Sequence, residues 1–313
     1  MPEKYSGKDL LHVIKEEVSK NLFFWLNKKT IKLLLVSTKK WLSSSLYRGT
    51  YRLNRKTVKN LIISLTSYPA RVPYVHHTIK TLLNQNLKPS RIILWLKPED
   101  YPRGENQLPK KLLKLKKKGL SIEWTRDIKS FTKLIPALQK YPDDIIVTVD
   151  DDIFYPEDML ERLYQAHLVF PDIIWTSVAP RISCAKNGNL LSCDHQWKEA
   201  SDDNRLPSYN NGVFGVSGVL YPPRVLHKDV CREDLFLKLC PTHDDLWFWA
   251  MAVLKGTKIA SLGYDYYHLG ELYVPNTQET GLWHTNTTSR SYAQLKNILK
   301  YYPQILPKIN TTI

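Results

Sequence analysis

The sequence predicts an α/β fold with a mostly parallel, Rossmann-like central sheet, and three observations support this fold class. Short apolar runs, several of them β-branched, alternate with helix-like stretches between residues 61 and 149. Strands that alternate with helices imply right-handed crossover connections, which place successive strands parallel. The chain has 313 residues, of which 43% are hydrophobic and 24% charged, so its length and composition are those of a globular protein with a full core.

The expected elements follow from this alternation in chain order. In the first half they are strand 61–65, helix 74–85, strand 91–96, helix 109–118, strand 121–125, helix 130–140 and strand 145–149. In the second half they are helix 157–170, strand 172–178, helix 243–255, strand 258–262 and helix 290–301. Residues 181–212 are polar, irregular and too long for a tight connection, so we expect a functional loop there.

Residues 1–58 form a separate basic extension. The first sixty residues hold 14 Lys and Arg against four Asp and Glu. Apolar residues recur at helical spacing between the lysines, at Leu10, Leu11, Ile14, Val18, Leu22 and Trp25. A basic amphipathic helix of this kind is typical of a membrane interface. The alternative interpretation is a helical extension that packs on the rest of the chain or on a partner.

The net charge of +15 indicates a partner that carries phosphate, such as nucleic acid, anionic lipid or a phosphorylated substrate. A second lysine cluster at 110–118 is interpreted as a solvated helix face. The four cysteines lack the close doublets of zinc sites and are expected as free thiols. No apolar stretch is long enough to span a bilayer and the N-terminus lacks a secretory signal pattern, so we expect a cytoplasmic protein.

Three consecutive aspartates, Asp150, Asp151 and Asp152, follow the predicted strand 145–149. Carboxylates at the carboxyl end of a strand face the crevice in which open α/β sheets bind ligands. Adjacent like charges repel one another, and oxygen-only donors favour a hard cation, so the pattern predicts a Mn²⁺ or Mg²⁺ site. The alternative is a solvated turn, because Asp is common where strands end.

The ends of two earlier strands also carry polar residues suited to a nucleotide. Thr66, Ser67, Tyr68 and Arg71 follow the first strand, and this sequence contains neither a dinucleotide fingerprint nor a P-loop. Hydroxyl groups and an Arg fork there could hold a nucleobase and a diphosphate, although the segment also reads as a plain turn.

Asp127 follows the third strand, and Lys133 lies on the first turn of the helix after it. Capping of that helix is the preferred single role of Asp127. Lys133 is expected to point towards the crevice.

Two later segments complete the candidate residues. Gly212, Gly215 and Gly218 precede the run 219–223, and this glycine-rich segment suggests either a loop around a bound substrate or a flexible hairpin. Asp244 and Asp245 begin an aromatic helix. Carboxylates suit the positive end of a helix, and one held there could also serve as a general base.

Together these blocks resemble the GT-A class of nucleotide-sugar glycosyltransferases, most closely the bacterial family-2-type enzymes of capsule and lipopolysaccharide synthesis. The resemblance covers about residues 60–265. Its most specific parts are residues 144–156, residues 218–223, and Asp244-Asp245 with the aromatic helix that follows.

The resemblance implies a role for each motif. Asp150 and Asp152 are the outer positions of the DxD motif, with Asp152 the metal ligand and Asp150 or Asp151 against the ribose. The remaining implied residues are Thr66, Ser67, Tyr68 and Arg71 around uridine and diphosphate, Asp127 and Lys133 on the far side of that pocket, Gly218, Tyr221 and Trp247 around the substrate, Asp245 or else Asp244 as the base, and His284 or else His268 as a further metal ligand. A histidine without any metal role is the alternative for both histidines.

The implied organisation is a GT-A domain at 59–265, with a nucleotide-sugar half at 59–156 and an acceptor half at 157–265. Residues 266–313 form a tail that closes the site. The implied reaction moves a sugar from a UDP-sugar to a glycan or lipid-linked acceptor with inversion, at the cytosolic face of an anionic membrane. Retention is the alternative, because these motifs do not determine the stereochemistry. A basic nucleic-acid-binding protein or metal-dependent nuclease is the alternative. It is disfavoured because the charge is concentrated outside the α/β unit and no nucleic-acid motif occurs.

Overall fold

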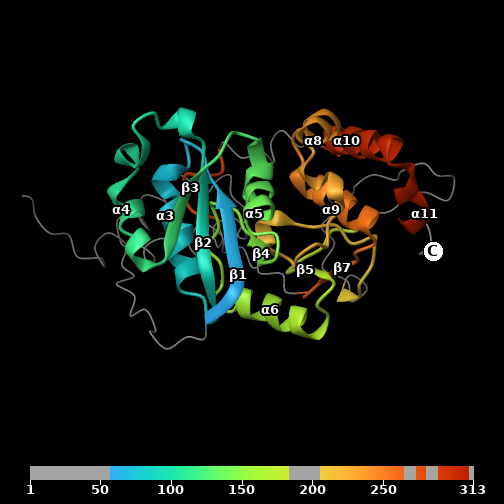
Figure 1. Ribbon diagram of the computed structural model, residues 1–313, viewed down its shortest axis with the longest axis horizontal. Helices are drawn as coiled ribbons and strands as arrows, with labels where there is room; N and C mark the ends of the chain where they lie inside the picture. Colours follow the sequence, from blue (N-terminus) through green and yellow to red (C-terminus); the bar gives the residue numbers. More distant parts are fainter. Residues whose placement is uncertain (1–56, 183–204, 264–272, 280–287, 310–313) are drawn as a thin grey trace, which may run out of the picture.

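The fold is organised around one seven-stranded mixed sheet (Figure 1). The computed structural model describes residues 57–182, 205–263, 273–279 and 288–309. The strands are β1 (Thr57–Thr66), β2 (Lys88–Leu96), β3 (Leu120–Trp124), β4 (Ile145–Thr148), β5 (Ile174–Thr176), β6 (Val219–Tyr221) and β7 (Ile259–Ser261), in the spatial order β3-β2-β1-β4-β6-β5-β7. β6 runs antiparallel to β4 and β5, and the other neighbouring pairs are parallel. The predicted α/β fold class with a mostly parallel sheet is therefore confirmed.

Helices cover both faces of the sheet. They are α3 (Val72–Leu83), α4 (Lys110–Leu113), α5 (Ile135–Lys140), α6 (Met159–Val169), α8 (Glu233–Leu239), α9 (Asp244–Lys255), α10 (Thr288–Tyr301) and α11 (Leu306–Ile309). One hydrophobic cluster contains Ile62 and Ile146 with residues of α5, α8, α9 and α10. The other contains Ile63 and Val147 with residues of α3, α4 and α6. Because both faces of β1 and β4 are buried, these strands read as continuous apolar runs.

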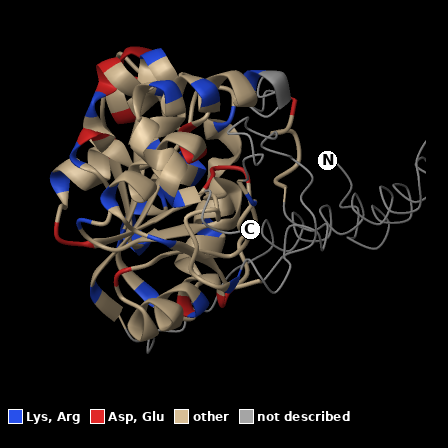
Figure 2. Ribbon diagram, turned by 90° about the vertical axis from the view of Figure 1, so that its right-hand side faces the viewer, with Lys and Arg blue, Asp and Glu red and all other residues tan. Residues whose placement is uncertain are grey.

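The four C-terminal helices gather at one end of the molecule, beyond the β5 and β7 side of the sheet (Figure 1). Figure 2 shows this end with basic and acidic residues interspersed on the helices. Trp247 of α9 is fully buried there, and its indole nitrogen donates to the Val230 carbonyl at 3.1 Å. The expectation that Trp247 lies around a substrate is wrong, because the indole is part of the core.

Strand β6 directly follows the glycine-rich segment and includes Tyr221, which was expected to lie near a bound substrate. Val219–Tyr221 pairs antiparallel with β4, with Ile146 opposite Tyr221, and Tyr221 is 1% exposed. Gly218 precedes this strand at φ 81°, a value that favours glycine. Tyr221 therefore lies within the sheet, and the predicted loop ends before β6.

Two expected helices are broken into shorter pieces. The lysine-rich stretch 109–118 forms α4 and then a 3₁₀ turn, Lys116–Lys118, which ends at Gly119 with φ 114°. Like charges three and four residues apart destabilise a continuous helix. The stretch 130–140 begins as the 3₁₀ turn Lys129–Lys133, and α5 starts only at Ile135 because Pro136 cannot continue a helix from before it. Helix α8 had no counterpart among the expected elements.

The predicted N-terminal extension overlaps the first strand of the sheet by two residues. β1 begins at Thr57, so residues 57 and 58 belong to the α/β fold, and residues 1–56 lie outside the described part of the chain. Within the described segments, no helix combines the length and apolar character needed to cross a bilayer.

Candidate active site at the carboxyl edge of the sheet

The candidate site lies where β1 and β4 end side by side. These two strands are parallel, with Ser64 opposite Thr148, so the segments after them emerge at the same edge of the sheet. Ser67 Oγ donates to Asp151 Oδ2 at 2.5 Å, and Thr78 Oγ1 of α3 donates to the Asp151 carbonyl at 2.9 Å. The strand order thus joins the first polar segment to the aspartate triplet.

Arg71 pairs with two of the three aspartates. Its guanidinium lies 2.8 Å from Asp151 Oδ1 and 3.0 Å from Asp152 Oδ2, and its side chain is 11% exposed. Burial alone would lower the pKa of Arg71, but Asp151 and Asp152 offset this effect and hold the pKa above its ordinary value. Arg71 is therefore a permanent cation at the site, where it balances charge that would otherwise be costly to bury.

A segment from the C-terminal part of the chain covers the triplet. Val274 donates its backbone N–H to the Asp152 carbonyl at 2.7 Å, and Gln278 Nε2 donates to Asp152 Oδ2 at 2.6 Å. Arg71 Nε donates to the Thr277 carbonyl at 3.1 Å. Burial, and then the charge of Asp151, raise the pKa of Asp152 to about 7. Neither Thr277 nor Gln278 was predicted, since nothing in their local sequence indicates a contact with residue 152.

Lys133 joins the triplet to the second acidic motif. Its Nζ lies 2.8 Å from Asp150 Oδ1 and 3.2 Å from Asp244 Oδ2, and the residue is 7% exposed. Ser64 Oγ donates to the Lys133 carbonyl at 2.6 Å and fixes the backbone there. Burial alone would lower the pKa of Lys133, but Asp150, Asp244 and Asp245 hold it well above its ordinary value. One buried ammonium group therefore brings together two motifs from distant parts of the sequence.

Asp245 is held by the turn Gly215–Ser217 that precedes β6. The Gly215 N–H donates to Asp245 Oδ2 at 2.9 Å. A Cβ added at Gly215 would lie 2.8 Å from Lys133 Nζ and 2.9 Å from Asp245 Oδ1, so a larger residue would displace at least one of these side-chain ends. Burial, and then the charge of Asp244, raise the pKa of Asp245 to about 7. A carboxylate with that pKa can accept a proton near neutral pH.

Tyr155 forms hydrogen bonds with two segments of the site, and it was not among the residues predicted from the sequence. Its hydroxyl accepts the Asp150 N–H at 2.8 Å and donates to the Val216 carbonyl at 3.0 Å. The Tyr221 hydroxyl is buried nearby, and burial followed by the charge of Asp245 raises the pKa of Tyr221 well above its ordinary value. Tyr155 thus connects the aspartate triplet with the turn that holds Asp245.

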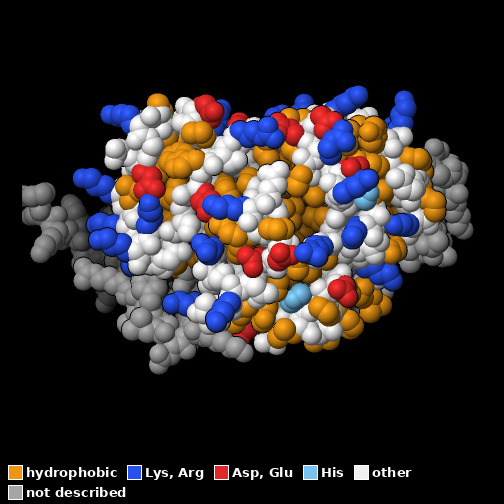
Figure 3. All heavy atoms as spheres, in the orientation of Figure 1, with side chains coloured by type: hydrophobic (Ala, Val, Ile, Leu, Met, Phe, Trp, Pro, Cys, Tyr) orange, Lys and Arg blue, Asp and Glu red, His pale blue; other side chains and the backbone are white. Residues whose placement is uncertain are grey.

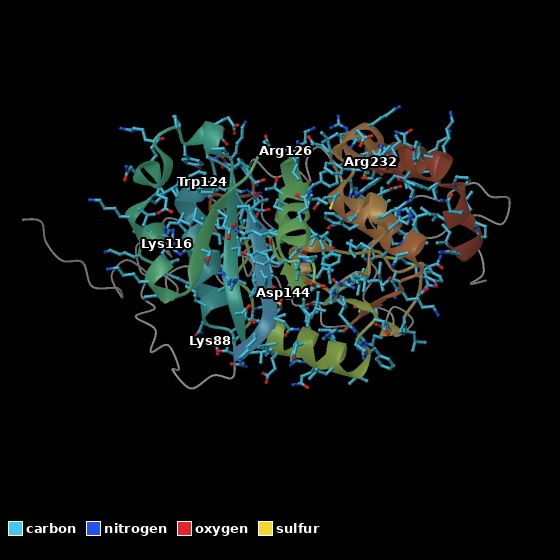
Figure 4. All side chains as sticks on the ribbon, viewed as in Figure 1. Lys88, Lys116, Trp124, Arg126, Asp144 and Arg232 are labelled. Carbon is cyan, nitrogen blue, oxygen red and sulfur yellow. The ribbon has the colours of Figure 1, made fainter. Side chains whose placement is uncertain are left out.

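Three predicted residues do not join these contacts. Thr66 Oγ1 donates to the Trp95 carbonyl on the neighbouring strand at 3.1 Å. Tyr68 is 36% exposed, with the Arg71 guanidinium 5.5 Å from its ring centre. Asp127 has a side chain 52% exposed and accepts the Lys129 N–H at 2.8 Å, whereas the N-cap position of the 3₁₀ turn Lys129–Lys133 is Ile128. Figure 4 labels Arg126, the residue before Asp127, at the carboxyl edge of the sheet.

The acidic residues of the site are candidates for holding a divalent cation. Within the described segments, no three His, Cys, Asp or Glu residues surround one point, and His268 and His284 lie outside those segments. The site nevertheless brings five carboxylates against two cations, Arg71 and Lys133. No hydrogen bond from a described residue reaches Asp150 Oδ2 or Asp152 Oδ1. Mg²⁺ sites use one or two carboxylates completed by substrate phosphates, so these residues fit such an ion.

Comparisons with known proteins found no matching family model and no matching curated protein. Among solved structures, the mannosyltransferase PcManGT from Pyrobaculum calidifontis, in complex with GDP-Man and Mn²⁺, is 13% identical with a TM-score of 0.39 over 90% of this chain and 82% of that one. S. aureus TarS 1–349 is 14% identical with a TM-score of 0.40 over 66% of this chain and 58% of that one. A CMP:2-keto-3-deoxy-manno-octonic acid synthetase complexed with CTP is 14% identical, with a TM-score of 0.38 over 66% and 89%. Likenesses this distant assign no activity to the chain.

Proposed function

We propose that this protein is a GT-A glycosyltransferase that moves a sugar from a nucleoside diphosphate, UDP by preference, to a hydroxyl group of a glycan or lipid-linked glycan. The observation that carries the proposal is the meeting of Asp150 and Asp244 around Lys133, at the carboxyl edge of the sheet. Ligands bind at this edge in open α/β sheets. One acidic motif then serves the donor, and the other serves the acceptor.

The donor side has the groups needed to hold a diphosphate. Asp150 and Asp152 would bind Mn²⁺ or Mg²⁺, which neutralises the charge of the leaving diphosphate when bound. Arg71 is a fixed cation beside them and can form paired hydrogen bonds to phosphate oxygens. Ser67 orients Asp151, and Asp151 or Asp150 would contact the ribose.

The acceptor side has a base ready to remove a proton. Asp245 accepts the proton of the attacking hydroxyl, since its pKa of about 7 leaves a useful fraction ionised at neutral pH. The Gly215 N–H fixes one oxygen of Asp245, and Asp244 is the alternative base. Attack from the face opposite the leaving group would invert the anomeric carbon. A role in bacterial surface polysaccharide synthesis at the cytosolic membrane face agrees with the basic N-terminal segment.

Substitution of the two acidic motifs tests this function. We expect Asp152→Asn and Asp245→Asn each to lower transfer at least about a hundredfold, because metal binding and proton removal are lost separately. Thermal stabilisation by a UDP-sugar with Mn²⁺ is expected to disappear in Asp152→Asn and to persist in Asp245→Asn. Asp234→Asn, at an exposed aspartate paired with Arg232, is the matched control. Wild-type turnover by either site variant, measured on a panel of nucleotide sugars, contradicts the proposal.

A further inference from the structure

A dense group of lysines covers the flank of the molecule beside edge strand β3. We define the lysine flank as Lys80, Lys110, Lys111, Lys114, Lys117 and Lys118. The residues at 110–118 are exposed, whereas Lys80 is half-buried at the end of α3. Figure 3 shows basic side chains along this margin, and the labelled Lys116 marks the place in Figure 4, far from Arg232.

The lysines at 110–118 lie on a segment that packs against the body of the protein, and their charges act on Lys80. Leu112 and Leu115 are buried beneath them at 0% and 3% exposure, which holds the 110–118 segment against the body of the protein. α4 packs on α3, and burial followed by the charges of Lys111 and Lys118 lowers the pKa of Lys80. The lysines of α3 and of the segment 110–118 are therefore close enough for their charges to interact.

Few acids offset this charge. Lys116 pairs with Glu105 at 2.6 Å, but no carboxylate of a described residue lies within ion-pair distance of the exposed lysines at 110, 111, 114 and 117. Burial and the charges of Lys80 and Lys111 lower the pKa of His76 to about 4, so that histidine adds no charge at neutral pH. The exposed lysines at 110, 111, 114 and 117 therefore carry charge that no described carboxylate offsets.

The chemistry of the flank favours phospholipid headgroups over nucleic acid. The segment 110–118 contains six lysines with no arginine and no aromatic residue, whereas surfaces that bind single strands combine basic groups with aromatic stacking platforms. Clusters of four to eight basic residues are the pattern that anionic lipid surfaces attract. The basic N-terminal segment also enters the fold at Thr57, which pairs in register with Lys88.

We propose that the lysine flank is a contact with an anionic membrane surface. The inference rests on the membrane location proposed above and not on the chemistry of the site. The exposed lysines of the flank lie on α4 and the turn that leads into β3, whereas the site lies between β1 and β4, so strand β2 lies between them in the sheet. Docking through the flank therefore leaves the candidate active site open to a donor and an acceptor.

Vesicle sedimentation of the full-length chain tests the inference. The variant carries Lys110→Gln, Lys111→Gln, Lys114→Gln and Lys117→Gln. The matched control carries four exposed lysines changed in the same way on the other end of the molecule, Lys238→Gln, Lys255→Gln, Lys296→Gln and Lys300→Gln. Vesicles are pure phosphatidylcholine, or phosphatidylcholine with roughly 30% phosphatidylglycerol, because the attraction requires anionic lipid.

We expect the variant to lose more than about tenfold in partition to anionic vesicles, and the control less than about threefold, since each lysine near the surface contributes about fivefold. Raised salt should abolish the difference. Equal loss in variant and control overturns the inference. Retained vesicle binding with lost binding to a single-stranded oligonucleotide overturns it in favour of nucleic acid. Failure of the proposed reaction is seen separately, as absent donor turnover in all three proteins.

Discussion

Lys133 is the residue on which the geometry of the candidate site depends most directly. Its ammonium group contacts Asp150 and Asp244 at once, and its backbone is fixed by Ser64. A buried cation between two carboxylates stabilises them only while all three charges are present. Removal of the cation leaves like charges facing each other in a buried place.

The substitution Lys133→Met is therefore expected to destabilise the fold by roughly 3–5 kcal/mol. The loss should grow as pH rises, because protonation relieves the repulsion between the unpaired carboxylates only at low pH. Urea unfolding at pH 5 and pH 8 measures both effects. Lys129→Met, at an exposed lysine of the same 3₁₀ turn, is the control. An equal loss at the two pH values contradicts the charge argument.

Asp245 leads to a second expectation at the scale of one residue. The proposed base works only when ionised, and burial together with Asp244 raises its pKa to about 7. The rate kcat/KM should accordingly rise tenfold per pH unit below about pH 7 and level off above it. Measurement of kcat/KM with one donor between pH 5.5 and 9 tests this rise and plateau. A profile that is flat from pH 5.5 to 7 excludes Asp245 as the base.

At the scale of elements, the turn Gly215–Ser217 and strand β6 set the position of Asp245 relative to Lys133. β6 pairs with β4, which ends directly before the aspartate triplet, so one sheet places both motifs. Tyr155 connects the two segments through its hydroxyl. The antiparallel strand is therefore part of the construction of the site.

The substitution Gly215→Ala tests this placement. Its Cβ would lie closer than 3.0 Å to both Lys133 Nζ and Asp245 Oδ1, so we expect at least tenfold lower transfer. The cost in folding stability should be only ~1–3 kcal/mol, as for other cases of overpacking. Val216→Ala, which removes atoms from the same turn, is the control. Activity and urea midpoints near those of the wild type for Gly215→Ala would show that the turn is free to move.

Elements differed in how well the sequence predicted them. β4 was predictable because a strand buried on both faces is apolar throughout, and α9 because a glycine ends its regular pattern at Gly256. β6 has three residues, too few for an alternation to be detected. The contact of Gln278 with Asp152 depends on tertiary structure alone, so no local pattern could indicate it.

At the scale of the whole molecule, the charges fall into two separate regions. The site places surplus negative charge between β1 and β4, while the lysine flank places positive charge beside β3. Strand β2 lies between these two regions in the sheet. The vesicle experiment examines the molecule at this scale, since it changes a surface and leaves the site intact.

The cover formed by residues 273–279 has a consequence for synthesis on the ribosome. A nascent chain that has emerged as far as β6 already contains the aspartate triplet, Arg71 and Lys133. It still lacks Asp244, Asp245 and the Gln278 amide that binds Asp152. At elongation rates of about 5–20 residues per second, the growing chain spends several seconds with these carboxylates incompletely paired. The order of residues in the gene thus delays an assembled site until most of the chain has been translated.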